Sequence, residues 1–229
     1  MPKEQKTPKL AGHLVVCTPL YGAVPVATFN SFLSMLGSVP AFFEKFGLST
    51  LGGTYVQVAR RKIAEDVLER DKKDPVDYLL WVDSDSVFSP QDVIALVTSA
   101  KETKSDLLSG FYVSKQEPRK AVAYRYINKG FQQMADVPKN TLFNVDAVGF
   151  GFLLMKLSVL KALVEKYGLK KAFTVFDEES KEDLGEDLNF CKLAKKEGFN
   201  IRLNSAIKIG HAGSVATPDV FYALHEKRG

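Results

Sequence analysis

The chain has 229 residues, of which 45% are hydrophobic and 25% charged, a composition typical of soluble globular proteins that excludes a chain disordered throughout. Its 31 basic and 27 acidic residues give a net charge of +4 and a pI near 8.9. This mild, dispersed basic excess is compatible with a phosphate-bearing ligand and does not indicate nucleic acid. Cys17 and Cys191 belong to no CxxC pair, so we expect neither a disulfide framework nor a zinc ribbon.

The hydropathy of the chain and the composition of its N-terminus predict a single domain that does not enter a membrane. No run of about 18 apolar residues is present, so no membrane-spanning helix is expected. The charged N-terminus lacks an apolar signal core. We expect residues 1–10 to form a flexible tail, residues 11–229 to form a single domain, and the location to be a reducing cytoplasm.

Short apolar runs alternate with amphipathic stretches, which predicts an α/β sheet. The pattern indicates a strand over residues 14–17, a loop beginning at Thr18, and a helix over residues 24–36. A second helix follows Gly52-Gly53, where Thr54 and Gln57 have the spacing of a capping box. Asp74-Pro75 ends this helical pattern.

The apolar run at residues 78–82 does not alternate, which is typical of a central parallel strand buried on both faces. It leads directly into Asp83-Ser84-Asp85. Ser89 as N-cap and Pro90 as first residue then open a helix. The remaining predicted strands, some of them antiparallel, cover residues 106–111, 121–126, 143–148, 152–156, 200–203 and 207–209, and the remaining helices cover residues 157–167 and 185–197.

The two carboxylates after the central strand are candidate metal ligands. Side chains two positions apart on an extended backbone point the same way, so Asp83 and Asp85 can converge. Their charges repel, and a divalent cation removes that cost. Ligands of open α/β sheets bind beyond the carboxyl ends of strands, where this pair falls. The alternative is an ordinary polar turn.

Two further features carry possible chemistry. Glu186 and Asp187 fall in the first turn of a predicted helix, where they either complement the helix dipole or supply a general base. His211 lies in a glycine-rich loop just after a strand, where it is either a surface residue or a ligand.

Taken in this order, the pieces resemble compact glycosyltransferases of the GT-A fold, of the kind found in phage, viral and bacterial genomes. The resemblance covers residues 54–213 and rests on four segments: VARRKIAEDVLE, DYLLWVDSDSVFSPQDVIALV, SGFYVSK with VDAVGFGFLLMK, and GEDLNFCKLAKKEGFNIRLNSAIKIGHAG. It implies a Rossmann-like α/β fold with a mixed, mostly parallel central sheet flanked by helices. It also implies metal-dependent transfer of a sugar from a nucleoside diphosphate to an acceptor hydroxyl.

The resemblance assigns roles to individual residues. Asp83, Asp85 and His211 match the positions that bind Mn²⁺ or Mg²⁺, with Asp85 and His211 as direct ligands and Asp83 either facing the ribose or binding the metal through water. Asp187 matches the general base, and Glu186 beside it matches a residue that binds acceptor hydroxyls. Donor-binding positions correspond to Thr18, Pro19, Tyr21, Arg60, Asp83, Ser84 and Lys115, and the acceptor side corresponds to Gly149, Phe150 and Gly151.

These roles imply an inverting reaction with UDP as the default nucleotide, GDP as the other candidate, and a glycan or another hydroxyl compound as acceptor. Two alternatives stay open. The DSDS segment also fits the first motif of haloacid dehalogenase-like phosphohydrolases, with Asp83 as nucleophile and Asp85 as acid/base. The other alternative is a catalytically inactive sugar-binding module.

Overall fold

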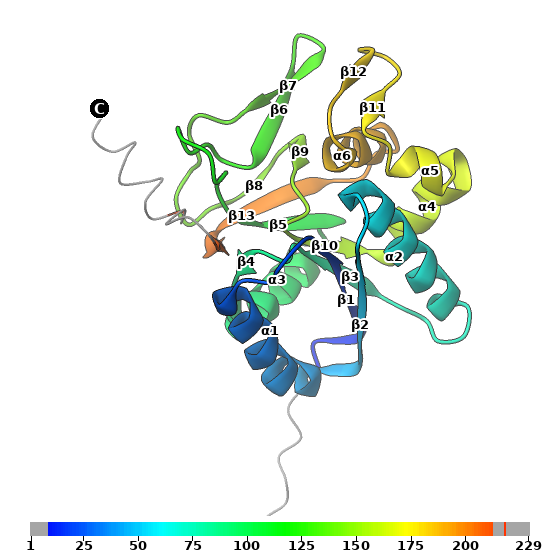
Figure 1. Cartoon of the computed structure of the whole chain (residues 1–229), viewed down its shortest axis with the longest axis vertical. Coiled ribbons are helices and arrows are strands. Elements are labelled where there is room, and N and C mark those ends of the chain that lie inside the picture. The colour runs from blue at the N-terminus through cyan, green and yellow to red at the C-terminus, as the bar shows by residue number, and fades with distance from the viewer. Residues whose placement is uncertain (1–8, 213–217, 219–229) are drawn as a thin grey trace, which may run out of the picture.

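The computed structural model describes residues 9–212 and Pro218 (Figure 1). Its centre is a mixed sheet of seven strands in the order β2-β1-β3-β10-β5-β13-β8. These strands are β1 (Ala11–Leu20), β2 (Phe43–Gly52), β3 (Tyr78–Val82), β5 (Leu107–Phe111), β8 (Leu142–Asn144), β10 (Phe152–Lys156) and β13 (Ile201–Lys208). β1, β2, β3, β5 and β13 run parallel to one another, while β10 lies antiparallel between β3 and β5 and β8 lies antiparallel to β13. The expected α/β class with a mixed sheet is confirmed.

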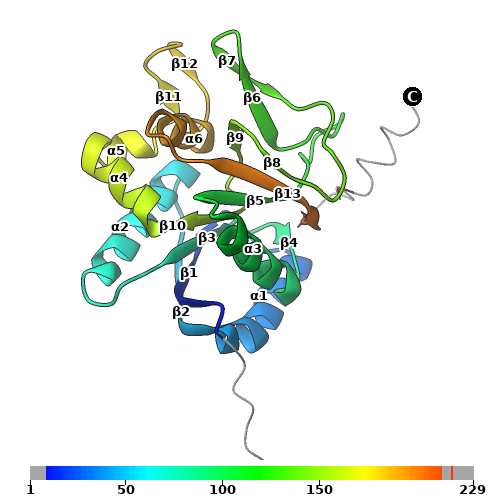
Figure 2. The same cartoon turned by 180° about the vertical axis from the view of Figure 1, so that it is seen from behind.

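The central strand β3 is buried on both faces, as its continuous apolar sequence predicts. Leu79 and Trp81 enter one hydrophobic core, while Leu80 and Val82 enter the other. The first core is covered by α2 (Val56–Asp71), α4 (Leu157–Tyr167), α5 (Leu169–Ala172) and α6 (Glu186–Lys196). The second is covered by α1 (Val26–Ser38), η1 (Val39–Phe42) and α3 (Pro90–Thr103). Figures 1 and 2 show these two groups of helices on opposite sides of the sheet.

One of the two predicted N-terminal helix caps is confirmed, and the other is wrong. Ser89 caps α3, because its hydroxyl accepts from the backbone N–H of Asp92 while the Asp92 carboxylate accepts from the N–H of Ser89. The capping box predicted at Thr54 does not form. α2 begins one residue later, its N-cap is Tyr55, and no side chain caps it.

Strand pairing corrects three sequence predictions. β2 was not expected, because an edge strand that pairs only with β1 buries just two of its ten side chains. Residues 143–148 do not form one strand: β8 joins the main sheet, and β9 (Ala147–Val148) pairs with β6 (Ala123–Ile127) instead. Residues 200–203 and 207–209 are parts of one strand, β13, whose register shifts between Asn204 and Lys208.

Three small sheets complete the described structure. β7 (Gly130–Gln133) forms a hairpin with β6, β11 (Phe176–Asp177) pairs with β12 (Glu182–Asp183), and β4 (Ser86–Val87) pairs with β14 (Gly210–His211). The β6–β7 and β11–β12 hairpins stand on the same end of the molecule, above the main sheet in Figure 1. β4 and β14 are two residues long each, and they bring the segments that follow β3 and β13 together.

The part of the expected N-terminal tail that the structure describes contacts the folded domain. Residues 1–8 of the expected tail lie outside the described residues. Lys9 donates to the carbonyls of Ala41 (2.9 Å) and Phe43 (2.6 Å), so it is attached to η1 and β2. Cys17 and Cys191 are both buried, and each is a free thiol. Within residues 9–212, no helix is long and apolar enough to cross a bilayer.

Candidate functional site

The predicted site residues gather at the carboxyl ends of the parallel strands. β1 runs into Tyr21, β3 into residues 83–85, β5 into Tyr112, and β13 into His211. Short contacts join these segments: the Tyr21 N–H donates to the Ser84 hydroxyl (3.3 Å), and the Ala212 N–H donates to the Asp85 carbonyl (2.7 Å). The site therefore lies at the edge where open α/β sheets bind ligands.

Asp85 and His211 meet although they are far apart in the sequence. The β4–β14 pairing sets His211 opposite Ser86, and His211 Nε2 lies 3.5 Å from Asp85 Oδ1. The other ring nitrogen, Nδ1, lies 2.8 Å from the Val113 carbonyl. A carbonyl only accepts, so Nδ1 carries the proton. Nε2 therefore faces a carboxylate oxygen, and a positive charge, on the ring or between the two groups, makes this contact favourable.

These residues fit a divalent cation. Asp85 Oδ1 is buried and has no hydrogen-bond partner in the structure. Burial acts to raise the pKa of Asp85, but contacts with His211 and Lys115 outweigh it and lower that pKa to about 2, so the carboxylate is ionised. Histidines that bind metals almost always donate their other ring N–H to a carboxylate, a backbone carbonyl or water, and His211 Nδ1 has such a partner in Val113. Mn²⁺ or Mg²⁺ held by one or two protein groups completes its coordination with phosphate and water.

Asp83 does not join that pair. No group of three or more histidine, cysteine or acidic side chains is placed to hold a metal in the part of the chain that the structure describes. Asp83 instead accepts from Arg60 Nη2 (2.7 Å), and Arg60 Nη1 donates to Glu186 Oε1 (2.6 Å). Of the three expected ligands, the structure brings Asp85 and His211 together and gives Asp83 a different partner.

Arg60 links the two acidic motifs of the chain. Its guanidinium lies over the Phe150 ring, 5.0 Å from the ring centroid, and the residue is only 3% exposed. Burial acts to lower its pKa, but the adjacent carboxylates of Asp83 and Glu186 raise it above the ordinary value, so the charge is retained. Arg60 and Glu186 were expected to contact donor and acceptor. In this structure both are buried against each other, and their contacts position the protein groups around them.

Asp187 has the properties of a general base. It lies in the first turn of α6 and accepts from the N–H of Leu188 (2.8 Å). Burial raises its pKa to about 6; Arg60 acts to lower the pKa and Glu186 to raise it. A carboxylate with a pKa near neutrality, beside a cluster of charged groups, is poised to take up and release a proton.

Tyr112 explains the glycines of the Gly149-Phe150-Gly151 segment. Its hydroxyl accepts from the Gly151 N–H (3.0 Å) and its ring packs edge-on against His211. A Cβ at Gly149 would come within 2.2 Å of the Tyr112 hydroxyl, and one at Gly151 within 2.9 Å of its ring. Phe150 is 1% exposed, so its side chain supports Arg60 rather than an acceptor surface. The close approach of Tyr112 to Gly149 and Gly151 could not be predicted from the sequence, in which the two glycines are its available signal.

A pocket of about 330 Å³ adjoins the acidic segment. It is bounded by the end of β1, the start of α2 and residues 83–85, and its lining includes Pro19, Gln57 and Ser84. Two tyrosines at its rim are largely exposed, Tyr21 by 79% and Tyr55 by 75%. Tyr55 had not been predicted. Thr18, expected in a loop, lies within β1 and is 1% exposed, so it does not reach this pocket's surface.

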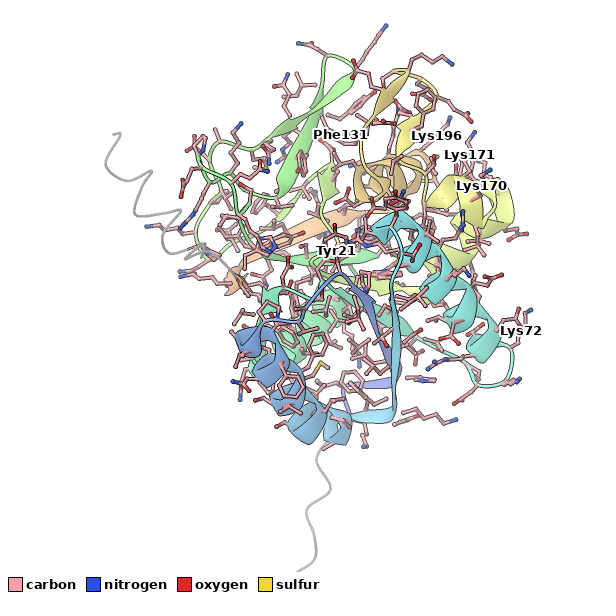
Figure 3. The ribbon with its side chains drawn as sticks, in the orientation of Figure 1. Tyr21, Lys72, Phe131, Lys170, Lys171 and Lys196 are labelled. Atoms are coloured by element: carbon pink, nitrogen blue, oxygen red, sulfur yellow. The ribbon has the colours of Figure 1, made fainter. Side chains whose placement is uncertain are left out.

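A second pocket, of about 290 Å³, lies between α5, α6 and β11. Lysines gather around it, and Figure 3 shows Lys170, Lys171 and Lys196 well away from Tyr21. Acidic partners balance much of this charge, since Lys171 pairs with Glu178 and Lys196 with Glu179. None of the predicted site residues lines this pocket.

Comparison with known proteins supports the fold. No protein-family model matches the chain, and no curated protein matches it. Among solved structures it is similar to A197 from STIV, with a TM-score of 0.59 and 21% sequence identity over 91% of each chain. At this identity the likeness concerns the fold, and it extends over nearly the whole length of both chains.

Proposed function

We propose that this protein is a metal-dependent glycosyltransferase of the GT-A fold. It moves a sugar from a nucleoside diphosphate, UDP by default, to a hydroxyl group of a glycan or another acceptor. The observation that carries the proposal is the meeting of Asp85 Oδ1 and His211 Nε2, 3.5 Å apart, beside a pocket at the carboxyl edge of the sheet.

The pocket between β1 and α2 suits a nucleoside. Its volume lies at the lower end of the range of small-molecule sites. The exposed rings of Tyr21 and Tyr55 offer flat apolar faces on which a base can stack. Because Ser84 and Asp85 line the same pocket, a diphosphate attached to that nucleoside lies towards the Asp85–His211 pair.

Asp85 and His211 would hold Mn²⁺ or Mg²⁺ there, and the chemistry such an ion supplies is neutralisation of the charge on the leaving diphosphate. The chain adds cationic side chains of its own. Lys115 pairs with Asp85, and its ammonium lies where it can contact phosphate oxygens. Arg60 is buried and holds Asp83 and Glu186, so it acts as a positioning residue.

Asp187 takes the proton in the proposed reaction. Its carboxylate accepts the proton of the acceptor hydroxyl while the hydroxyl oxygen forms a bond to the anomeric carbon. The bond from that carbon to the diphosphate oxygen breaks, and the diphosphate leaves with the electron pair. A single in-line displacement inverts the configuration at the anomeric carbon. Retention of the donor's configuration in the product, measured by NMR, would rule this step out.

A thermal-shift panel tests the proposal. Wild-type protein is heated with nucleoside diphosphates and nucleotide sugars, with and without Mn²⁺, and one nucleotide is expected to raise the melting temperature only when Mn²⁺ is present. Asp85→Asn should lose that shift. Asp183→Asn, which changes an exposed carboxylate on β12, should keep it. If no nucleotide stabilises the wild type with Mn²⁺, the proposal is wrong.

Activity assays with the same nucleotides separate the alternatives. A phosphohydrolase would use Asp83 as a nucleophile, but Asp83 Oδ1 is held by Arg60 in this structure, which favours glycosyl transfer. Release of phosphate from the donor or from simple phosphate esters would favour the phosphohydrolase. Nucleotide binding without turnover on any donor and acceptor would favour an inactive binding module.

A further inference from the structure

Lys115 forms an ion pair with Asp85, the carboxylate to which the proposed function assigns a metal ion. Its ammonium forms an ion pair with Asp85 Oδ2, while the other oxygen of the same carboxylate faces His211. The lysine side chain is 39% exposed. A positive charge of the protein itself therefore partly neutralises Asp85, at the place where an external cation would bind.

The position of Lys115 in the fold lets it leave Asp85 without disturbing the other ligand. Val113 pairs with Ala121 in an isolated bridge, and the Ser114 N–H donates to the Lys120 carbonyl (2.9 Å). These contacts close a loop over residues 114–120 and fix its base. The Val113 carbonyl at that base holds His211 Nδ1, whereas Lys115 lies on the exposed part of the loop.

A lysine ammonium and a divalent ion compete for one carboxylate. Each gains from the same negative charge, and the two cations repel each other when both are close to it. A diphosphate changes this balance, because its oxygens offer the ammonium a second anionic partner. The lysine then loses little by leaving Asp85.

Building on the proposed function, we propose that Lys115 is an internal counter-ion of Asp85 that weakens metal binding in the free protein. It transfers to the diphosphate when nucleotide and metal bind together. Metal and nucleotide therefore bind cooperatively, and each raises the affinity for the other by the same factor. The consequence is that the site fills with metal mainly when a donor is present.

Calorimetric titration of Mn²⁺ into the protein, with and without UDP or the nucleotide found by the thermal-shift panel, tests this inference. Lys115→Met removes the charge and keeps the length of the side chain. It should tighten Mn²⁺ binding by the nucleotide-free protein by up to about 5-fold, as expected for loss of a partly exposed competing ion pair. It should also reduce the factor by which the nucleotide strengthens Mn²⁺ binding.

Matched variants make the result specific. Lys115→Arg keeps the charge and should retain weak metal binding and strong cooperativity. Lys120→Met removes an exposed lysine from the same loop and should resemble the wild type. Unchanged or weaker Mn²⁺ binding by Lys115→Met, while the wild type binds Mn²⁺ and nucleotide, overturns this inference alone. Failure of the wild type to bind either one overturns the proposed function and the inference with it.

Discussion

Replacing Asp187 by asparagine is expected to make the protein more stable while it abolishes activity. Burial raises the pKa of this carboxyl from the ordinary value of 3.8 to about 6, with Arg60 acting to lower it and Glu186 to raise it. A pKa difference of this size between the folded and the unfolded chain lowers the free energy of unfolding by about 3 kcal/mol when the group is ionised. Asparagine keeps the shape and carries no charge.

The sign of the effect depends on pH. Below pH 3.8 the carboxyl is protonated in both states and costs nothing. Between pH 3.8 and about 6 the folded protein binds more protons than the unfolded chain, so the free energy of unfolding falls as the pH rises. Above that window the full cost is present. Asp187→Asn should therefore match the wild type near pH 4 and exceed its stability by up to about 3 kcal/mol at pH 8.

Urea unfolding measured at both pH values checks this expectation. Trp81 is the chain's single tryptophan and is buried in the first core, so its fluorescence reports unfolding. In a thermal scan at pH 8 the variant should melt roughly 5–10 °C higher. Asp183→Asn should change stability by no more than about 0.5 kcal/mol at either pH. Equal stability of Asp187→Asn and the wild type at pH 8 would refute the reasoning.

The same variant tests the base. Asp187→Asn should bind Mn²⁺ and nucleotide as the wild type does and transfer no sugar. In the wild type, kcat should rise with pH through about 6 as the carboxylate ionises. Transfer by the variant at near wild-type rate would remove Asp187 from the mechanism.

Three further substitutions test the packing around the site. Arg60→Met leaves the carboxylates of Asp83 and Glu186 without their shared ion-pair partner. We expect it to lower the free energy of unfolding by about 3 kcal/mol or more in urea titration. Gly149→Ala places a methyl group 2.2 Å from the Tyr112 hydroxyl and should cost about 1–3 kcal/mol, part of which Tyr112→Phe should recover in the double variant. Tyr55→Ala should weaken nucleotide binding by about 1–3 kcal/mol, measured by calorimetry, through loss of a stacking surface.

Each of these has a result that would contradict it. A loss below about 1 kcal/mol in Arg60→Met would mean that water or rearrangement replaces the guanidinium. Strictly additive losses in the double variant would show that the tyrosine hydroxyl is not what excludes a side chain at Gly149. Tyr126→Ala removes another exposed tyrosine, outside the pocket, and is the control for Tyr55→Ala; equal effects of the two would remove Tyr55 from the nucleotide site.

The sequence predicted best those features that depend on neighbouring residues. The unbroken apolar run of β3 predicted a strand buried on both faces, and its residues enter two different cores. Ser89, Pro90 and Asp92 lie within four positions of one another and specify the start of α3. The acidic segment directly follows the last residue of β3. Because ligands bind beyond the carboxyl ends of strands, this position in the sequence was enough to predict that the segment lies at the ligand-binding edge of the sheet.

Partners distant in the chain were decided by the tertiary structure. Asp83 and Asp85 are alike in sequence, yet Arg60 takes the first and His211 and Lys115 take the second. The spacing of two residues predicted that both would hold one ion, but Arg60 from α2 pairs with Asp83 while His211 from β14 faces Asp85. Likewise, residues 143–148 read as one strand and divide between two sheets.

The physical reason is the range of the interactions. Strand and helix patterns arise from contacts a few residues apart, and the sequence contains them in full. Which cation neutralises which carboxylate depends on how helices pack on the sheet and on the order of its strands, and both are fixed only when the whole core closes. For this protein the sequence determined where acidic groups would gather, and the fold decided what each of them faces.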